Sequence, residues 1–107
     1  MNIQVNTDNH IVGREELTTE VKSLVESGLG RFRERITRIE VHLSDENSVK
    51  GGEDDKRCMI EARIEGLQPT VATHHAGTIN DAVHGAVDKI KRALDSTLQK
   101  RQDARRA

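Results

Sequence analysis

Histidine and cysteine are the residue types of this chain best suited to bind a metal ion or act as a nucleophile. His74 and His75 are adjacent, His84 follows, and Cys58 precedes them. If residues 70–75 form a strand, the two adjacent histidines point to opposite faces of a sheet and cannot easily bind one ion together. A structural zinc site needs about four ligands, and no Cys-x-x-Cys or His-x-x-x-His spacing is present. We therefore expect no metal site, and we expect Cys58 to be a buried and unreactive core residue.

Carboxylates are the second group that could do chemistry. Glu61 and Glu65 alternate with Arg57 and Arg63 in a segment with the period of a strand. Pairs of opposite charge on neighbouring strands contribute roughly 0.2–1 kcal/mol each, and such pairs account for these residues without a catalytic role. We therefore expect no enzymatic activity, no cofactor and no small-molecule substrate.

Cations form the most informative pattern, and they are concentrated in the last third of the chain. From residue 86 onward there are seven basic and three acidic residues, a local charge of +4 in a chain whose net charge is −1. Lys89, Arg92 and Lys100 fall on the side of a helix opposite its apolar stripe. Two interpretations are open. Basic residues can simply meet the negative end of a helix dipole, or they can form a contact surface for a polyanion.

Charge is also uneven in the middle of the chain. Residues 31–38 carry four arginines and one glutamate, whereas residues 40–65 carry eight acids and four bases. Such a bipolar molecule can orient itself in the field of a polyanion. Phe32 is the only Phe, Tyr or Trp residue, so the chain has no set of aromatic rings on which to stack bases. Nucleic-acid binding would have to use phosphates, sugars and shape.

Alternating apolar and polar residues predict four strands, at about residues 1–6, 38–43, 57–65 and 70–75. The connection over residues 44–55 contains five acids and predicts a flexible hairpin loop.

Apolar residues three and four positions apart predict two helices. The first runs from about Arg14 to about Arg33, with close packing at Gly28 and fraying beyond Gly30. The second begins after Thr78 as the N-cap and continues to Arg106.

The order β-α-β-β-β-α predicts an α+β fold, a four-stranded mixed sheet with two helices packed on one face. The predicted core combines the apolar stripes of the helices with the inward residues of the strands: Leu17, Val21, Val25, Phe32, Ile39, Val41, Ile60, Ile64, Ile79, Val83, Val87, Ile90 and Leu94. Residues 1–100 are predicted to form one domain, and residues 101–107 a basic, disordered tail.

Composition supports one thin, highly charged domain, because 34% of the 107 residues are hydrophobic and 33% are charged. There is no run of 18 apolar residues and no signal-peptide pattern, so we expect a cytoplasmic protein without a membrane partner. A single cysteine agrees with a reducing compartment.

Several motifs resemble the ribosome hibernation-promoting factors, a family that includes the ribosome-associated inhibitor A proteins, once called sigma modulation proteins. They are the segment 38–47 (RIEVHLSDEN), the Lys50-Gly51-Gly52 step, residues 55–58 (DKRC) with 61–63 (EAR), and the closing pattern over residues 82–94. The resemblance covers almost the whole chain and implies the same fold, with two near-parallel helices on one sheet face.

The resemblance also implies a function. Family members occupy the small ribosomal subunit where messenger and transfer RNA would lie, and they block translation under stress. Lys89 and Arg92 match the basic pair of the family's second helix, and Arg31 matches a basic position near the end of the first. Charge and wheel position extend this predicted RNA-binding set to Arg33, Arg35, Lys91 and Lys100.

Two hypotheses follow. The first is a non-catalytic factor of the short form that binds ribosomal RNA of the small subunit, inhibits or stores ribosomes, and is a monomer off the ribosome. The alternative is a stress-related protein-interaction module that uses an acidic sheet face and the 44–55 hairpin.

Overall fold

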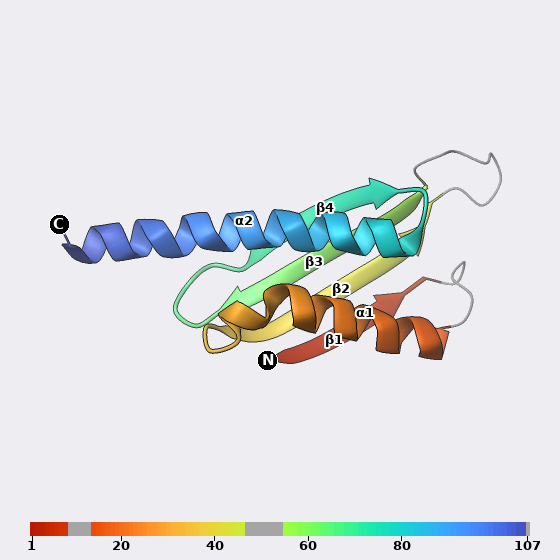
Figure 1. Ribbon diagram of the computed structural model, residues 1–107, viewed down its shortest axis with the longest axis horizontal. Coiled ribbons are helices and arrows are strands. Elements are labelled where there is room, and N and C mark those ends of the chain that lie inside the picture. The colour runs from red at the N-terminus through yellow and green to blue at the C-terminus, as the bar shows by residue number, and fades with distance from the viewer. Residues whose placement is uncertain (9–13, 47–54, 107) are drawn as a thin grey trace.

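The computed structural model describes residues 1–8, 14–46 and 55–106 and confirms the predicted α+β order (Figure 1). The elements are β1 (Asn2–Thr7), α1 (Arg14–Leu29), the short 3-10 helix η1 (Gly30–Phe32), β2 (Ile36–Asp45), β3 (Lys56–Ile64), β4 (Thr70–Ala76) and α2 (Ile79–Arg106). Residues 47–54, which make up most of the predicted hairpin loop, lie outside the described residues.

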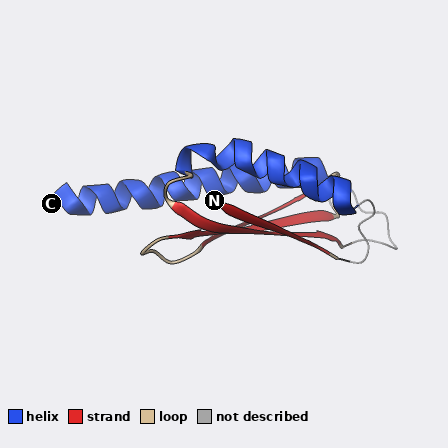
Figure 2. Cartoon of the chain, turned by 90° about the horizontal axis from the view of Figure 1, so that it is seen from below, coloured by secondary structure: helices blue, strands red, loops and turns tan. Residues whose placement is uncertain are grey.

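The sheet has the strand order β1-β2-β3-β4, with β1 parallel to β2 and the other neighbours antiparallel. The turn between β3 and β4 is tight. The Leu67 amide donates to the Ile64 carbonyl at 3.1 Å, and Gly66 has a φ of 77°, a conformation that residues with a Cβ adopt at a cost. Both helices cover the same face of the sheet, as predicted (Figure 2).

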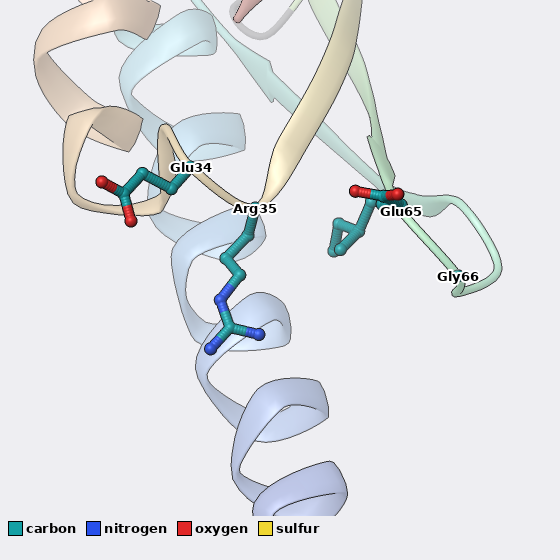
Figure 3. Close-up of a pocket in the computed structure, with 5 residues that line it drawn as sticks. Glu34, Arg35, Glu65 and Gly66 are labelled. Atoms are coloured by element: carbon teal, nitrogen blue, oxygen red, sulfur yellow. The ribbon is translucent and has the colours of Figure 1, made fainter.

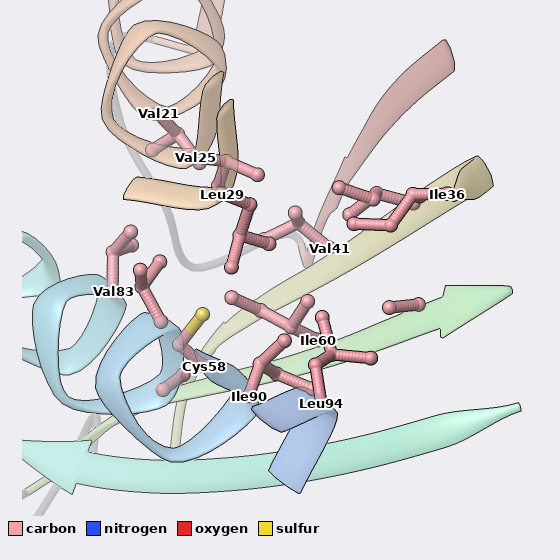
Figure 4. Packing of buried hydrophobic residues seen from close by; sticks show 14 of the residues in the cluster. Val21, Val25, Leu29, Ile36, Val41, Cys58, Ile60, Val83, Ile90 and Leu94 are labelled. Atoms are coloured by element: carbon pink, nitrogen blue, oxygen red, sulfur yellow. The ribbon is translucent and has the colours of Figure 1, made fainter. Parts of the chain in front are cut away.

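The core lies between this sheet face and the helices (Figure 4). Every predicted core residue is buried except Leu17 and Ile79, which are partly buried and pack against it. Leu29, the last residue of α1, is also fully buried. Strand alternation and helical spacing each turn one face inward, so the two layers close over one apolar interior.

The end of helix α1 differs from the predicted one. Helix α1 ends at Leu29, because the chain tightens into η1, where the Arg33 amide donates to the Gly30 carbonyl at 3.1 Å. Helix α2 runs to Arg106, as its apolar spacing predicts, and so includes residues 101–106, for which a disordered tail was also expected. Arg, Gln and Ala make up five of the six residues in this stretch and have high intrinsic helix propensity. The domain boundary at residue 100 stays a prediction.

The sheet face away from the helices carries charges of both signs. On β2 and β3 it carries three arginines (Arg38, Arg57, Arg63) and two glutamates (Glu40, Glu61). The predicted acidic sheet face is therefore not found on these strands.

Two ion pairs on this face run along the strands. Arg38 pairs with Glu40 at 2.9 Å and Arg63 with Glu61 at 3.0 Å. Across the strands, Arg38 lies opposite Arg63 and Glu40 opposite Glu61. The interpretation as cross-strand pairs of opposite charge was therefore wrong for Glu61 and Arg63, because antiparallel alignment brings an Arg-x-Glu and a Glu-x-Arg segment into rows of like charge. Arg57 does pair across the sheet, with Glu46 just beyond β2 at 3.5 Å.

No helix in the described part of the chain is both long enough and apolar enough to cross a membrane.

Helices α1 and α2 approach closely where Gly28 faces Val87. A Cβ atom on Gly28 would overlap Cγ1 of Val87, whereas a Cβ on Gly30 would meet nothing within 4 Å. The predicted close packing at Gly28 is confirmed.

We expect Gly28→Ala to lower the free energy of unfolding by about 1–2 kcal/mol, because overpacking outweighs the gain in helix propensity. Gly30→Ala is the matched control and should be neutral or stabilising by up to about 1 kcal/mol. Urea denaturation of both variants measures the difference, and equal stabilities would contradict the packing argument.

Candidate nucleic-acid interface

Helix α2 is the platform for the predicted basic residues. Its start is capped as predicted, since the Asp81 amide donates to Thr78 Oγ1 at 3.1 Å. Its 28 residues span about 42 Å, and its C-terminal part projects past the sheet (Figure 1). Ile90 and Leu94 are fully buried, which turns the opposite side, with Lys89, Arg92 and Lys100, toward solvent.

Arg31 joins this helix from a distant part of the sequence. Its Nη2 donates to Oδ2 of Asp95 in α2, and its guanidinium carbon lies 4.7 Å from the centre of the Phe32 ring. The Arg31 side chain remains 58% exposed. The structure thereby brings Arg31, one arginine of the basic segment 31–38, to the basic side of α2, although the two lie far apart in the sequence.

Lys89 lies on the other flank of α2. Its ammonium group donates to the carbonyl oxygen of Thr73 in β4 at 2.8 Å. Arg92 follows three residues after Lys89 and precedes Asp95 by three, and each such step rotates the side chain by about 60° around the helix. Arg92 therefore lies between the β4 flank and the Arg31 flank, and it is exposed.

Of the other predicted residues, Arg33 and Arg35 lie outside α2 and Lys91 lies within it. Arg33 and Arg35 are exposed in the turn between η1 and β2, where the Arg35 amide donates to the Phe32 carbonyl at 2.8 Å. Neither side chain makes an ion pair with another residue in the described ranges. Lys91 is half-buried. The exposed members of the predicted set on or beside α2 are thus Arg31, Lys89, Arg92 and Lys100.

A pocket lies beside Arg35 at the end of the sheet, lined by Glu34, Arg35, Ile64, Glu65 and Gly66 (Figure 3). The charged side chains of Glu34, Arg35 and Glu65 point away from one another in this view. Catalysis needs groups that converge on one reacting atom, so this pocket offers no support for an enzymatic role.

The histidines and the cysteine are separated as their alternation predicted. Nε2 of His75 lies 3.4 Å from Oε2 of Glu46 on the open side of the sheet. The His74 ring instead lies against α2, where it fills the space that a Cβ atom on Gly85 would need. Cys58 is fully buried opposite His74. Among the described residues, no three His, Cys, Asp or Glu side chains are grouped so that they could hold a metal ion.

Burial raises the pKa of the Cys58 thiol from 9.0 to about 12. Because folding favours the protonated thiol, this contribution to stability is complete below about pH 9 and is lost as the pH rises toward about 12. The thiolate is the reactive form. The thiol should therefore be unreactive in the folded protein at neutral pH.

At pH 8 we expect iodoacetamide to alkylate Cys58 of the folded protein about 100-fold more slowly than that of the urea-unfolded chain, since both access and thiolate fraction are reduced. Mass spectrometry of timed samples measures both rates, and Cys58→Ala gives the unlabelled baseline. Rapid labelling of the folded protein would show that the thiol is not sealed in the core.

Asp95 is the residue of this surface that sequence reasoning missed. It was counted only as one of three acids among the cations of α2. Its partner Arg31 is 64 residues away, and no local spacing marks such a pair. Only the packing of α1 and η1 against α2 reveals it.

Comparisons with known proteins identify the family of this chain. Residues 9–102 match the family described as Sigma 54 modulation protein / S30EA ribosomal protein. A search of curated proteins found no match.

Two solved structures are similar in fold. A ribosomal subunit interface protein from Coxiella burnetii is 18% identical, with a TM-score of 0.69 over 92% of this chain and 99% of the other. The N-terminal domain of Protein Y from Thermus thermophilus is 20% identical, with a TM-score of 0.64 over 91% of this chain and 99% of the other.

Proposed function

Because this chain belongs to the sigma 54 modulation protein / S30EA ribosomal protein family, we propose that it binds ribosomal RNA of the small subunit without catalysis. By occupying the place of messenger and transfer RNA, it would inhibit or store ribosomes under stress. It would act in the cytoplasm, without a cofactor, and as a monomer when off the ribosome.

The observation that carries the proposal is the placement of cations on the helical side of the molecule. Arg92 and Lys100 are exposed on α2, and Arg31 is held beside them by Asp95. On the exposed face of the sheet, Arg38 and Arg63 are each paired with a glutamate of the same strand, and Arg57 is paired with Glu46. A polyanion would be attracted mainly by the exposed cations of α2 and Arg31, and not by α1, whose exposed glutamates (Glu15, Glu16, Glu20 and Glu26) outnumber its cations.

The chemistry of this surface favours backbone contacts over base readout. Phe32, the only aromatic residue, is 5% exposed and therefore unavailable for stacking on a base. Arg and Lys side chains bind phosphates through charge-assisted hydrogen bonds. The protein would thus recognise the shape and charge of folded RNA, with an affinity that falls as salt rises.

The alternative, a protein-interaction module, has less support. On β2 and β3 the open face is not acidic. Of the five acids in the 44–55 hairpin, Asp45 and Asp55 pair with Lys56, Glu46 lies beside Arg57 and His75, and Glu53 and Asp54 lie outside the described residues. It is retained as one outcome of the following test.

We expect the double variant Arg92→Glu/Lys100→Glu to lose cosedimentation with small ribosomal subunits at physiological salt. Both side chains point away from the core, so the fold should be intact. Two lost phosphate contacts should also lower the slope of log affinity against log salt by about 1.4–1.8. Lys89 is left unchanged, because its bond to Thr73 gives it a second role at the edge of the sheet.

The matched control is Arg57→Glu/Arg63→Glu, which changes the net charge equally on the open sheet face. It should cosediment like the parent protein. If the α2 variant binds as well as the parent across the salt range, the RNA-contact proposal is wrong. If only the sheet-face variant loses binding, the alternative surface becomes the better explanation.

A further inference from the structure

An acid within a cationic surface needs an explanation. Asp95 lies three residues after Arg92 and four after Lys91, on the part of α2 that the proposed function assigns to RNA. Taken alone, its carboxylate would repel phosphates and weaken binding. Its side chain is 54% exposed, so it is not needed to fill the core.

Asp95 does not pair with its helical neighbours but with Arg31 of η1. The guanidinium group is thereby held on two sides, by the carboxylate from α2 and by the face of the Phe32 ring 4.7 Å away. Phe32 is itself buried, so the ring is a fixed support. Together these contacts restrict an arginine that would otherwise sample many rotamers.

The held guanidinium retains the capacity to bind an anion. It carries five N–H donors in a planar fork, and the contact with Asp95 uses Nη2. Donors therefore remain for a phosphate oxygen on the exposed side. A side chain that is ordered before binding loses less entropy when the complex forms. This strengthens binding without any additional contact.

We propose that Asp95 is a positioning residue that holds Arg31 ready for an RNA phosphate, an inference that rests on the proposed ribosome-binding function. Asp95 itself does not touch the RNA. Its negative charge opposes binding, and its hold on Arg31 outweighs that opposition. The two effects have opposite signs, so substitution can separate them.

The test measures the affinity of the full chain for purified small ribosomal subunits at one fixed salt concentration. Asp95→Asn keeps the shape and removes the charge. If positioning dominates, this variant binds about threefold to tenfold more weakly, although it has lost a negative charge. Asp95→Glu retains a carboxylate and should recover part of the affinity.

Asp88→Asn is the matched control. Asp88 is exposed and lies seven residues earlier on nearly the same side of α2, and it makes no ion pair with any residue that the structure describes. Removing its charge should strengthen binding slightly, by about threefold or less, through the general field alone. Thermal unfolding of both variants should be close to that of the parent, because exposed ion pairs contribute little to stability.

Measuring Asp95→Asn in protein that also carries Arg31→Ala distinguishes positioning from a structural role more sharply. In Arg31→Ala protein, Asp95 has no guanidinium to hold, so Asp95→Asn should now strengthen binding as Asp88→Asn does. A merely structural role for Asp95 would weaken binding in both backgrounds. The expected result is that the effect of Asp95→Asn reverses its sign between the parent protein and the Arg31→Ala background.

The failures are distinguishable. If Asp95→Asn strengthens binding in both backgrounds while Arg92→Glu/Lys100→Glu abolishes it, Asp95 competes with phosphate and only the positioning inference is overturned. If the Arg92 and Lys100 double variant also binds like the parent, the ribosome-binding surface is elsewhere and both proposals are overturned.

Discussion

The close approach of the two helices is the constraint on which the functional surface depends. Gly28 leaves room for Val87, so α1 can lie against α2 over one face of the sheet. Two residues beyond Gly28 the chain enters η1, and about two turns beyond Val87 lies Asp95. The ion pair between Arg31 and Asp95 forms at this end of the contact. Packing in the core and the placement of exposed cations are therefore consequences of the same contact.

Local patterns in the sequence predict most of the fold. Alternation in residues 38–43 and 57–65 predicted two strands, and the spacing from Ile79 to Leu98 predicted the long helix, because each buried face repeats with the period of its backbone. Contacts between side chains on different elements could not be predicted from such local patterns. The rows of like charge on β2 and β3 depend on antiparallel register, and the partners of Arg31 and Lys89 depend on how α2 lies on the molecule.

The two sides of the sheet carry charge in different ways. On the open side, Arg38 and Arg63 are each matched by a glutamate on the same strand. On the helical side, Arg92 and Lys100 lie exposed along α2, and the one acid described as paired there, Asp95, holds an arginine rather than a helical neighbour. A protein with a net charge of −1 can in this way present one side to a polyanion.

Lysine footprinting tests most directly whether this helical side is the one that meets RNA. Acetylation rates would be measured by mass spectrometry with and without small ribosomal subunits, so that each lysine is compared with itself. The account predicts that the subunit slows acetylation of Lys100 and leaves Lys56, at the start of β3, unchanged. Protection of Lys56 with continued labelling of Lys100 would contradict it.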